Sequence, residues 1–188
     1  FNNNLITTLV NDTHVQAVLI EQLLQILPER GFEGVNIDFE YILPSDKMAF
    51  VDFIWNIRTS LNNEGYTLSL AVPPKISDAE SGTIRGGFDY ERLGEAANLI
   101  FLMTYEWGYT YSEPQPVAPI DEVRKVVQYA VSRIPNDKLV LGIPNYGYDW
   151  PLPYQNGVTK ARTIGNVEAV QLALAYGSEI LFDETSMT

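Results

Sequence analysis

One eight-residue segment constrains the fold of this chain more than any other feature. It runs from Gly34 to Tyr41 with the sequence GVNIDFEY, in which apolar and polar residues alternate. Successive side chains of a β-strand point to opposite faces, so each of the two sets shares one face. The polar set is Asn36, Asp38 and Glu40, and the apolar set is Val35, Ile37 and Phe39. We therefore predict a strand with one buried face and two carboxylates on the other.

The rest of the chain alternates between helical and extended patterns. The expected helices run from a cap at Asp12 or Thr13 to a stop at Gly31, from a cap at Ser45 or Asp46 to Leu61, from a cap at Asp89 to Ala96, from Pro119 to Arg133, and from Val167 to Ala175. The expected strands are residues 34–41, 67–72, 99–105, 139–146 and 179–182. The apolar side of the first helix is expected to comprise Val15, Val18, Leu19, Leu23, Leu24 and Leu27. Apolar strands separated by amphipathic helices predict an α/β fold with a parallel sheet covered on its outside.

Composition excludes several classes of function. The 188 residues carry a formal net charge of -12, which would repel nucleic-acid phosphates and anionic membranes. Cysteine is absent and His14 is the single histidine, so thiol chemistry and multi-histidine metal sites are excluded. No apolar run approaches the ~20 residues that a membrane span needs. We expect no cofactor, no metal, no nucleic-acid partner and no membrane span.

The two carboxylates on the polar face of residues 34–41 indicate acid–base chemistry. Buried carboxylates are costly unless they are paired or used, and two on one inward face push each other's pKa apart. Glu40 has the more apolar flanks, so it is the candidate that stays protonated and acts as general acid. In a barrel, Glu40 would lie at the carboxyl end of its strand, where barrel active sites are built. The alternative is a solvated edge strand with incidental acidic residues.

These residues resemble the DxxDxDxE signature of glycoside hydrolase family 18, the chitinase-like barrels. Glu33, Asn36, Asp38 and Glu40 stand at its four acidic positions, with Glu and Asn departing from the pattern at the first two. The form GVNIDFE is especially similar to bacterial spore-cortex and cell-wall members of the family.

Two further segments support this resemblance. Met103-Thr104-Tyr105-Glu106 is similar to the Met-x-Tyr-Asp motif at the end of the sixth barrel strand, with Glu in place of Asp. Residues 142–147, GIPNYG, resemble the seventh-strand segment that precedes an inserted α+β unit. The resemblance implies a (β/α)₈ barrel of which this chain supplies about strands four to seven. Residues 1–150 would belong to the barrel and residues 151–188 would begin the insertion.

The resemblance also implies a substrate-assisted, retaining mechanism. Glu40 would protonate the leaving oxygen and later deprotonate water, while Asp38 would orient the acetamido group of the substrate. Tyr105 would donate its hydroxyl to the acetamido oxygen. Asn36 can only hydrogen-bond where Asp could share a proton. Glu106 would contact the same sugar, although its longer side chain could shift that contact.

Aromatic residues follow the sixth and seventh strands and could stack on sugar faces. The candidates for substrate binding are Met103, Trp107, Tyr146 and Tyr148, together with Asn36 and Glu106. Tyr109, Tyr111 and Trp150 belong to the same aromatic groups. Packing of the loops is the alternative for each aromatic residue, and packing in the core is the alternative for Met103.

Three functional hypotheses remain at the level of sequence. The first is a monomeric hydrolase outside the cell, in the cell wall or spore envelope, that cleaves β-1,4 bonds next to N-acetylglucosamine in peptidoglycan; a chitinase is its near alternative. The second is a non-catalytic sugar-binding relative, which the presence of Glu40 disfavours. The third is a barrel enzyme of other chemistry, for which Lys75 is the one candidate Schiff-base lysine.

Overall fold

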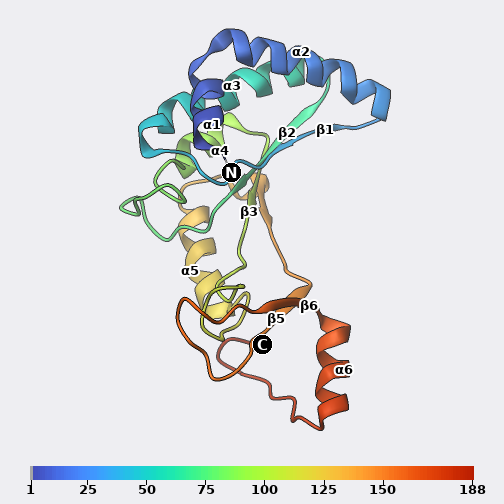
Figure 1. Ribbon diagram of the computed structural model, residues 1–188. Helices are drawn as coiled ribbons and strands as arrows, with labels where there is room; N and C mark the ends of the chain where they lie inside the picture. Colours follow the sequence, from blue (N-terminus) through green and yellow to red (C-terminus); the bar gives the residue numbers. More distant parts are fainter. Residues whose placement is uncertain (1) are drawn as a thin grey trace. The chain divides into compact units, whose positions relative to one another are not determined.

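The computed structural model of the protein describes residues 2–188, and its contacts divide the chain into two compact units. The first unit extends to Met103 and also includes Gln128–Leu141; the second comprises Thr104–Val127 and Gly142–Thr188. The helices are α1 Asn3–Asn11, α2 Thr13–Arg30, α3 Lys47–Asn63, α4 Tyr90–Ala96, α5 Ile120–Val131 and α6 Asn166–Tyr176, with 3₁₀ turns at Pro44–Asp46 and Asn136–Lys138. The strands are β1 Gly34–Ile37, β2 Thr67–Val72, β3 Leu99–Leu102, β4 Leu139–Leu141, β5 Tyr146–Asp149 and β6 Arg162–Gly165 (Figure 1).

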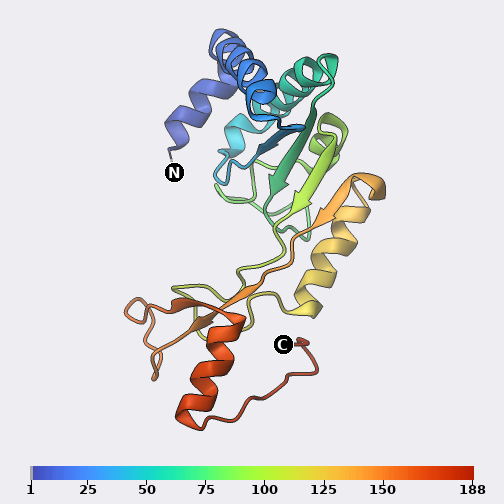
Figure 2. The ribbon, with the colours of Figure 1, turned by 90° about the vertical axis from the view of Figure 1, so that its right-hand side faces the viewer.

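A four-stranded parallel sheet organises the first unit. Its strand order is β1-β2-β3-β4, the order of the sequence, with Ile37 opposite Leu70 and Leu70 opposite Ile100 (Figure 2). Parallel neighbours need a crossover connection, and α3 and α4 provide the first two. The predicted parallel α/β sheet is confirmed for the first unit.

The core of this unit lies between the sheet and α3. The helix buries residues three and four positions apart, as an amphipathic helix requires: Phe50, Phe53, Ile54, Ile57 and Leu61 are all fully buried. They pack with the buried strand residues Leu68, Leu70, Val72, Ile100 and Leu102. Burying one such side chain contributes about 1.5–3 kcal/mol, so this face anchors the strands from which the site is built.

The caps predicted for α2 and α4 are confirmed. The Asp12 carboxylate accepts from the backbone N–H groups of His14 and Val15, and Gly31 ends α2 in the left-handed region at φ 66°. The Asp89 carboxylate accepts from the Arg92 backbone N–H at 3.1 Å. Such caps satisfy amide groups that the first helical turn leaves unpaired.

The helix α1 was not predicted, and its packing changes the buried face of α2. Gln16 is buried, whereas Val18 from the predicted apolar side is 41% exposed. The Gln16 side-chain amide donates to the carbonyls of Leu9 and Val10 and accepts from Asn56 Nδ2 at 2.9 Å. The amide thus connects three helices, a role that periodicity alone does not reveal.

Asp46 stands at the N-cap of α3, as predicted, but its carboxylate faces another helix and does not cap α3. Asp46 is buried and makes no capping hydrogen bond to α3. Its carboxylate accepts from Thr7 Oγ1 at 2.5 Å and from Asn11 Nδ2 at 3.3 Å, both in α1. A 3₁₀ turn at Pro44–Asp46 leads directly into α3 and takes the place of a side-chain cap.

Several predicted strands are shorter than expected. The ladder of β1 ends at Ile37, β3 ends at Leu102 and β4 ends at Leu141. The predicted strand 179–182 is wrong: within residues 2–188 this segment pairs with no other strand, and Leu181 and Phe182 are largely exposed.

The second unit is built on a two-stranded antiparallel sheet. β5 pairs with β6, with Tyr146 opposite Gly165 and Asp149 opposite Arg162, and α6 packs on both strands. The loop between residues 106 and 119 folds back on itself through hydrogen bonds from Trp107 N to Val117 O and from Gly108 N to Pro116 O. The helix predicted at 167–175 is confirmed as α6.

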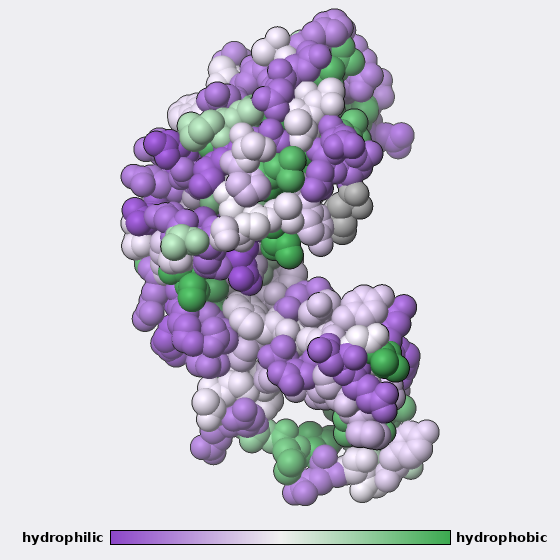
Figure 3. Space-filling model, turned by 60° about the vertical axis from the view of Figure 1, so that its left-hand side comes forward, coloured by the Kyte–Doolittle hydropathy of each residue, from purple (hydrophilic) through white to green (hydrophobic). Residues whose placement is uncertain are grey.

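Surface character agrees with the excess of acidic residues. Hydrophilic residues cover much of the face seen in Figure 3, and apolar residues form small separate groups. No helix of the part that the structure describes is long and apolar enough to cross a membrane.

Candidate active site

Burial separates the two sets of residues that alternate along residues 34–41. Ile37 is 5% exposed, and Val35 and Phe39 pack against the core. The Phe39 ring stacks on Phe53 with ring centroids 6.2 Å apart. On the other side, Asn36 and Asp38 are exposed and Glu40 is partly buried. The alternation is therefore observed from Val35 to Asp38, and Glu40 follows the end of β1.

Asn36 forms a side-chain hydrogen bond with the neighbouring strand. The Ser69 hydroxyl, on the neighbouring strand β2, donates to Asn36 Oδ1 at 2.8 Å. Both residues line a hollow of about 300 Å³ on the sheet, together with Leu99, Phe101 and Val140. Ser69 was not among the predicted residues, although alternation along β2 could have placed it on this face.

Glu106 of the second unit combines an unusual backbone conformation with two side-chain hydrogen bonds. Its backbone lies in the left-handed region at φ 69°, which is uncommon for a residue with a side chain. Its Oε1 accepts from the Tyr148 hydroxyl at 2.6 Å and from the Tyr146 hydroxyl at 3.0 Å. The structure thus brings together three of the predicted substrate-binding residues around one carboxylate.

The two tyrosines remain hydrogen-bond donors over a wide pH range. Burial raises the pKa of Tyr146, and the neighbouring Glu106 carboxylate raises it further, with a smaller contribution from Tyr105. The pKa of Tyr148 is raised by the same two causes, burial first. Neutral phenols beside an ionised carboxylate hold its orientation, because deprotonation would place two negative charges together.

The aromatic residues of β5 and Trp150, which follows this strand, form a continuous row. The rings of Tyr146 and Tyr148 lie 5.9 Å apart, and those of Tyr148 and Trp150 lie 5.6 Å apart. The Trp150 indole N–H donates to the Ser112 carbonyl at 2.8 Å. The row lines one side of a hollow of about 560 Å³ whose other walls include Val117 and Pro144. A partly open, aromatic hollow of this kind suits a ligand with flat apolar faces and polar edges.

Both backbone and side-chain hydrogen bonds hold the segment from Met103 to Trp107. Met103 N donates to Val72 O at 3.0 Å, and Trp107 O accepts from Gln115 Nε2 at 2.7 Å. Met103, Tyr105 and Trp107 are each partly exposed. Thr104, which the sequence did not single out, is 1% exposed and donates to the Gly142 carbonyl at 2.9 Å. Thr104 therefore links the ends of two predicted strands within the second unit.

Comparison with known proteins identifies the family. The profile of Glycosyl hydrolases family 18 matches residues 3–188. The chain belongs to this family. The resemblance stated from the motifs is confirmed, and so is its implication of a chitinase-like α/β fold.

Bacterial spore enzymes are among the relatives of this family 18 chain. It is 37% identical over 186 residues to the cortical fragment-lytic enzyme of Bacillus subtilis, covering 99% of this chain and 43% of that protein. The crystal structure of the spore cortex-lytic enzyme SleL of Bacillus megaterium matches with a TM-score of 0.94 at 35% identity, covering 100% of this chain and 43% of that one. A chitinase of Chromobacterium violaceum matches with a TM-score of 0.88 at 28% identity, covering 98% of this chain and 56% of that one. The chain spans less than half the length of the curated Bacillus relatives it matches.

Other residues considered from the sequence have contacts outside the family 18 motifs. Lys75 is 2% exposed and its ammonium donates to the Phe88 carbonyl at 2.7 Å. Arg85 pairs with Glu80 at 3.1 Å. Three more residues lie at the surface. Asp149 forms an ion pair with Arg162. The rings of Tyr109 and Tyr111 pack edge to face.

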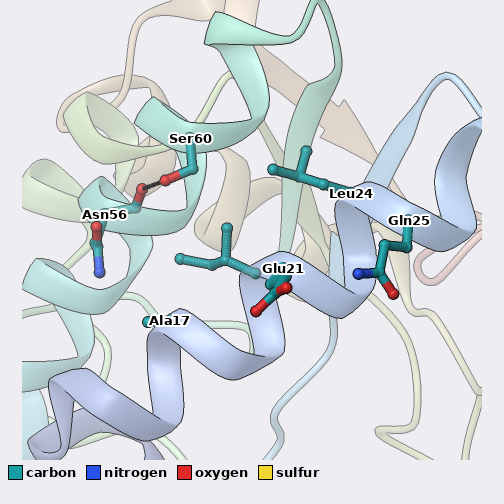
Figure 4. Close-up of a pocket in the computed structure, with 7 residues that line it drawn as sticks. Ala17, Glu21, Leu24, Gln25, Asn56 and Ser60 are labelled. Atoms are coloured by element: carbon teal, nitrogen blue, oxygen red, sulfur yellow. Dashed lines mark hydrogen bonds between the residues drawn. The ribbon is translucent and has the colours of Figure 1, made fainter.

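No group of three or more histidine or acidic residues in the described part of the chain could hold a metal ion. A hollow of about 460 Å³ between α2 and α3 also lies apart from the family 18 motifs (Figure 4). Its lining includes Ala17, Glu21, Leu24, Gln25, Asn56 and Ser60. None of the predicted site residues lines this hollow.

Proposed function

We propose that the protein hydrolyses β-1,4 bonds next to N-acetylglucosamine in peptidoglycan of the spore cortex or cell wall, with retention of configuration. The observation that carries the proposal is the segment 34–41 of a family 18 chain, where the apolar residues pack on the core, Asn36 and Asp38 are exposed, and Glu40 follows the end of β1. The names of the relatives support the substrate: a cortical fragment-lytic enzyme and a spore cortex-lytic enzyme are 37% and 35% identical to this chain.

The mechanism that we propose uses the substrate's own acetamido group as nucleophile. Its carbonyl oxygen attacks the anomeric carbon while Glu40 protonates the leaving glycosidic oxygen. Asp38 accepts the acetamido N–H and stabilises the positive cyclic intermediate, and Tyr105 donates to the acetamido oxygen. Glu40 then removes a proton from the water that opens the intermediate. Glu40 thereby recovers from water the proton that it gave to the leaving group, and it ends the cycle protonated.

We propose that the second unit supplies sugar contacts. Glu106 would accept a hydrogen bond from a sugar hydroxyl through Oε2, since both tyrosine hydroxyls bind Oε1. The rings of Tyr146, Tyr148 and Trp107 would stack on sugar faces, and Met103 would line the same region. Asn36, fixed by the hydrogen bond that it accepts from Ser69, would help to keep the segment that carries Asp38 and Glu40 in place. The protein would require neither a metal nor an organic cofactor for this chemistry.

We also propose the architecture and setting that this function implies. The parallel strands β1 to β4 would be strands four to seven of a (β/α)₈ barrel. Residues 151–188, with β6 and α6, would begin an inserted α+β unit. The protein would act as a monomer outside the cell, in the wall or spore envelope.

The test is an assay of glycan cleavage by the full-length protein. Cortical fragments and chitin oligomers are supplied separately, and new reducing ends are measured. Release from cortical fragments alone supports the proposal. Release from chitin oligomers alone would establish the second candidate, a chitinase, which the 28% identical chitinase structure keeps open.

The assigned acid has its own test. Glu40→Gln keeps the shape of the side chain but cannot give up a proton, so turnover should be abolished while glycan binding is retained. Asp52→Asn, on the exposed side of α3, is the matched control and should have wild-type activity. Turnover by Glu40→Gln would show that another residue is the acid.

A further inference from the structure

The loop after β2 contains a buried lysine for which the proposed chemistry has no use. Lys75 follows Pro73-Pro74 and is 2% exposed. Its ammonium donates to the Phe88 carbonyl at 2.7 Å and lies 5.6 Å from the centroid of the Tyr90 ring. Lysine is almost never fully buried, because desolvating its charge is costly. An apolar residue at this position would avoid that desolvation cost, so the hydrogen bond from Lys75 to Phe88 requires an explanation.

The backbone of Lys75 is tied to the same place. Its N–H donates to the Tyr90 hydroxyl oxygen at 3.2 Å, and the Tyr90 hydroxyl donates to the Pro73 carbonyl at 2.6 Å. Tyr90 is itself 1% exposed. The start of the loop, at residues 73–75, is thereby fixed to its end, at residues 88–90, by three buried hydrogen bonds.

The end of this loop packs on the segment that follows Glu40. A Cβ added to Gly87 would lie 2.4 Å from Ile42 O and 2.6 Å from Ile42 Cβ. A Cβ added to Gly86 would lie 3.0 Å from Pro44 Cγ. Glycine is needed at residue 87 because the two backbones approach more closely than any side chain allows. Ile42 is fully buried and stands two residues after Glu40.

We propose that Lys75 is a positioning residue for Glu40, and this inference rests on the proposed function. The ammonium holds the Phe88 carbonyl, which fixes Gly87 against the backbone of Ile42 and so fixes the end of the chain segment that presents the acid. The Phe88 ring also packs edge to face with Phe50, 5.7 Å between centroids, so the side chain of Phe88 is anchored in the core as well. Lysine suits this task because a long apolar stem can carry a strong donor to a distant buried carbonyl.

Lys75→Met tests the inference in the full-length protein, because methionine keeps the stem and removes the donor. We expect kcat on the cleaved glycan to fall about 10- to 100-fold, as small misplacements of catalytic groups do, with KM changed by less than about twofold. The melting temperature should fall only modestly, because the loss of the donor to the buried Phe88 carbonyl opposes the gain from removing a buried charge. A merely structural role would lower the stability in the same way but leave the kcat of the folded protein unchanged.

Lys138→Met is the matched control. The Lys138 ammonium donates to the carbonyls of Gly94 and Ala97 at 2.7 and 2.9 Å, but it precedes β4, at the amino end of the sheet. It should keep the wild-type kcat. If Lys75→Met does not fold, Gly87→Ala replaces it as the test, since the added methyl group pushes directly on Ile42 and should also lower kcat.

The possible results separate this inference from the proposed function. Wild-type kcat in a folded Lys75→Met or Gly87→Ala protein, with Glu40→Gln inactive, would overturn the positioning role and leave the function standing. A wild-type protein that cleaves neither cortical fragments nor chitin oligomers would overturn both.

Discussion

The two hydroxyls on the Glu106 carboxylate allow a quantitative prediction about substrate binding. Tyr148→Phe and Tyr146→Phe each remove one donor to Oε1 and leave the ring in place. A net hydrogen bond is worth about 0.5–1.5 kcal/mol, and these partly solvated pairs belong in the lower half of that range. One lost contact of about 0.5–1 kcal/mol corresponds to about a 2- to 5-fold weaker interaction. Tyr148, whose contact is shorter, should have the larger effect.

The double variant should lose more than the product of the single effects. After one substitution the remaining hydroxyl still holds the carboxylate, whereas after two the side chain can rotate about a backbone held at φ 69°. We expect KM for the cleaved glycan to rise about 2- to 5-fold in each single variant, and about 10- to 30-fold in the double variant.

Steady-state kinetics on purified cortical fragments would measure these changes. Tyr154→Phe is the control, because its hydroxyl donates to the Tyr111 carbonyl at 3.3 Å in the same unit and does not reach Glu106. The control should keep the wild-type KM. A folded double variant with wild-type KM and kcat would refute the idea that the tyrosines orient Glu106 for the substrate.

Three further predictions concern other parts of the chain. Asn36→Asp adds a negative charge beside the proposed acid, and such a charge raises the pKa of neighbouring carboxylates. The pH–rate curve should therefore move to higher pH, while the peak rate changes less. An unmoved curve contradicts this prediction. Gly108→Ala places a Cβ 2.1 Å from a backbone carbonyl oxygen and should cost about 1–3 kcal/mol in a urea unfolding experiment, whereas Gly165→Ala meets nothing within 4 Å and should be close to neutral. Asp89→Ala removes the cap that accepts from Arg92 N and should cost about 1 kcal/mol by the same measurement; an unchanged midpoint would show that α4 needs no cap.

Local sequence signals predicted much of the first unit. The ends of α2 and α4 follow from side chains that cap their own helix, and β2 was predicted at residues 67–72, its observed bounds. Alternation along residues 34–41 correctly separated the core face from the polar face. These predictions succeed because each depends on neighbours within a few residues, and such contacts are nearly the same in any fold.

Predictions failed where a residue's partner lies on another element. Asp46 has the residue type of a cap, but Thr7 and Asn11 on α1 take its carboxylate. Residues 179–182 have a strand-like pattern, but within the described chain no strand pairs with them. Ser69 and Thr104 were missed because their roles depend on neighbouring segments 33 and 38 residues away.

The sequence by itself determined the family, the order of its motifs, and the exposure of Asn36 and Asp38 beside a buried Ile37, because covalent spacing and strand alternation are properties of the chain. The tertiary structure alone decided that two tyrosine hydroxyls donate to Glu106 and that the Lys75 ammonium donates to the carbonyl of Phe88, the residue after Gly87. These contacts join residues 13 to 42 positions apart. They exist only after the strands and loops have packed, when burial makes each unpaired polar group costly enough to select its partner.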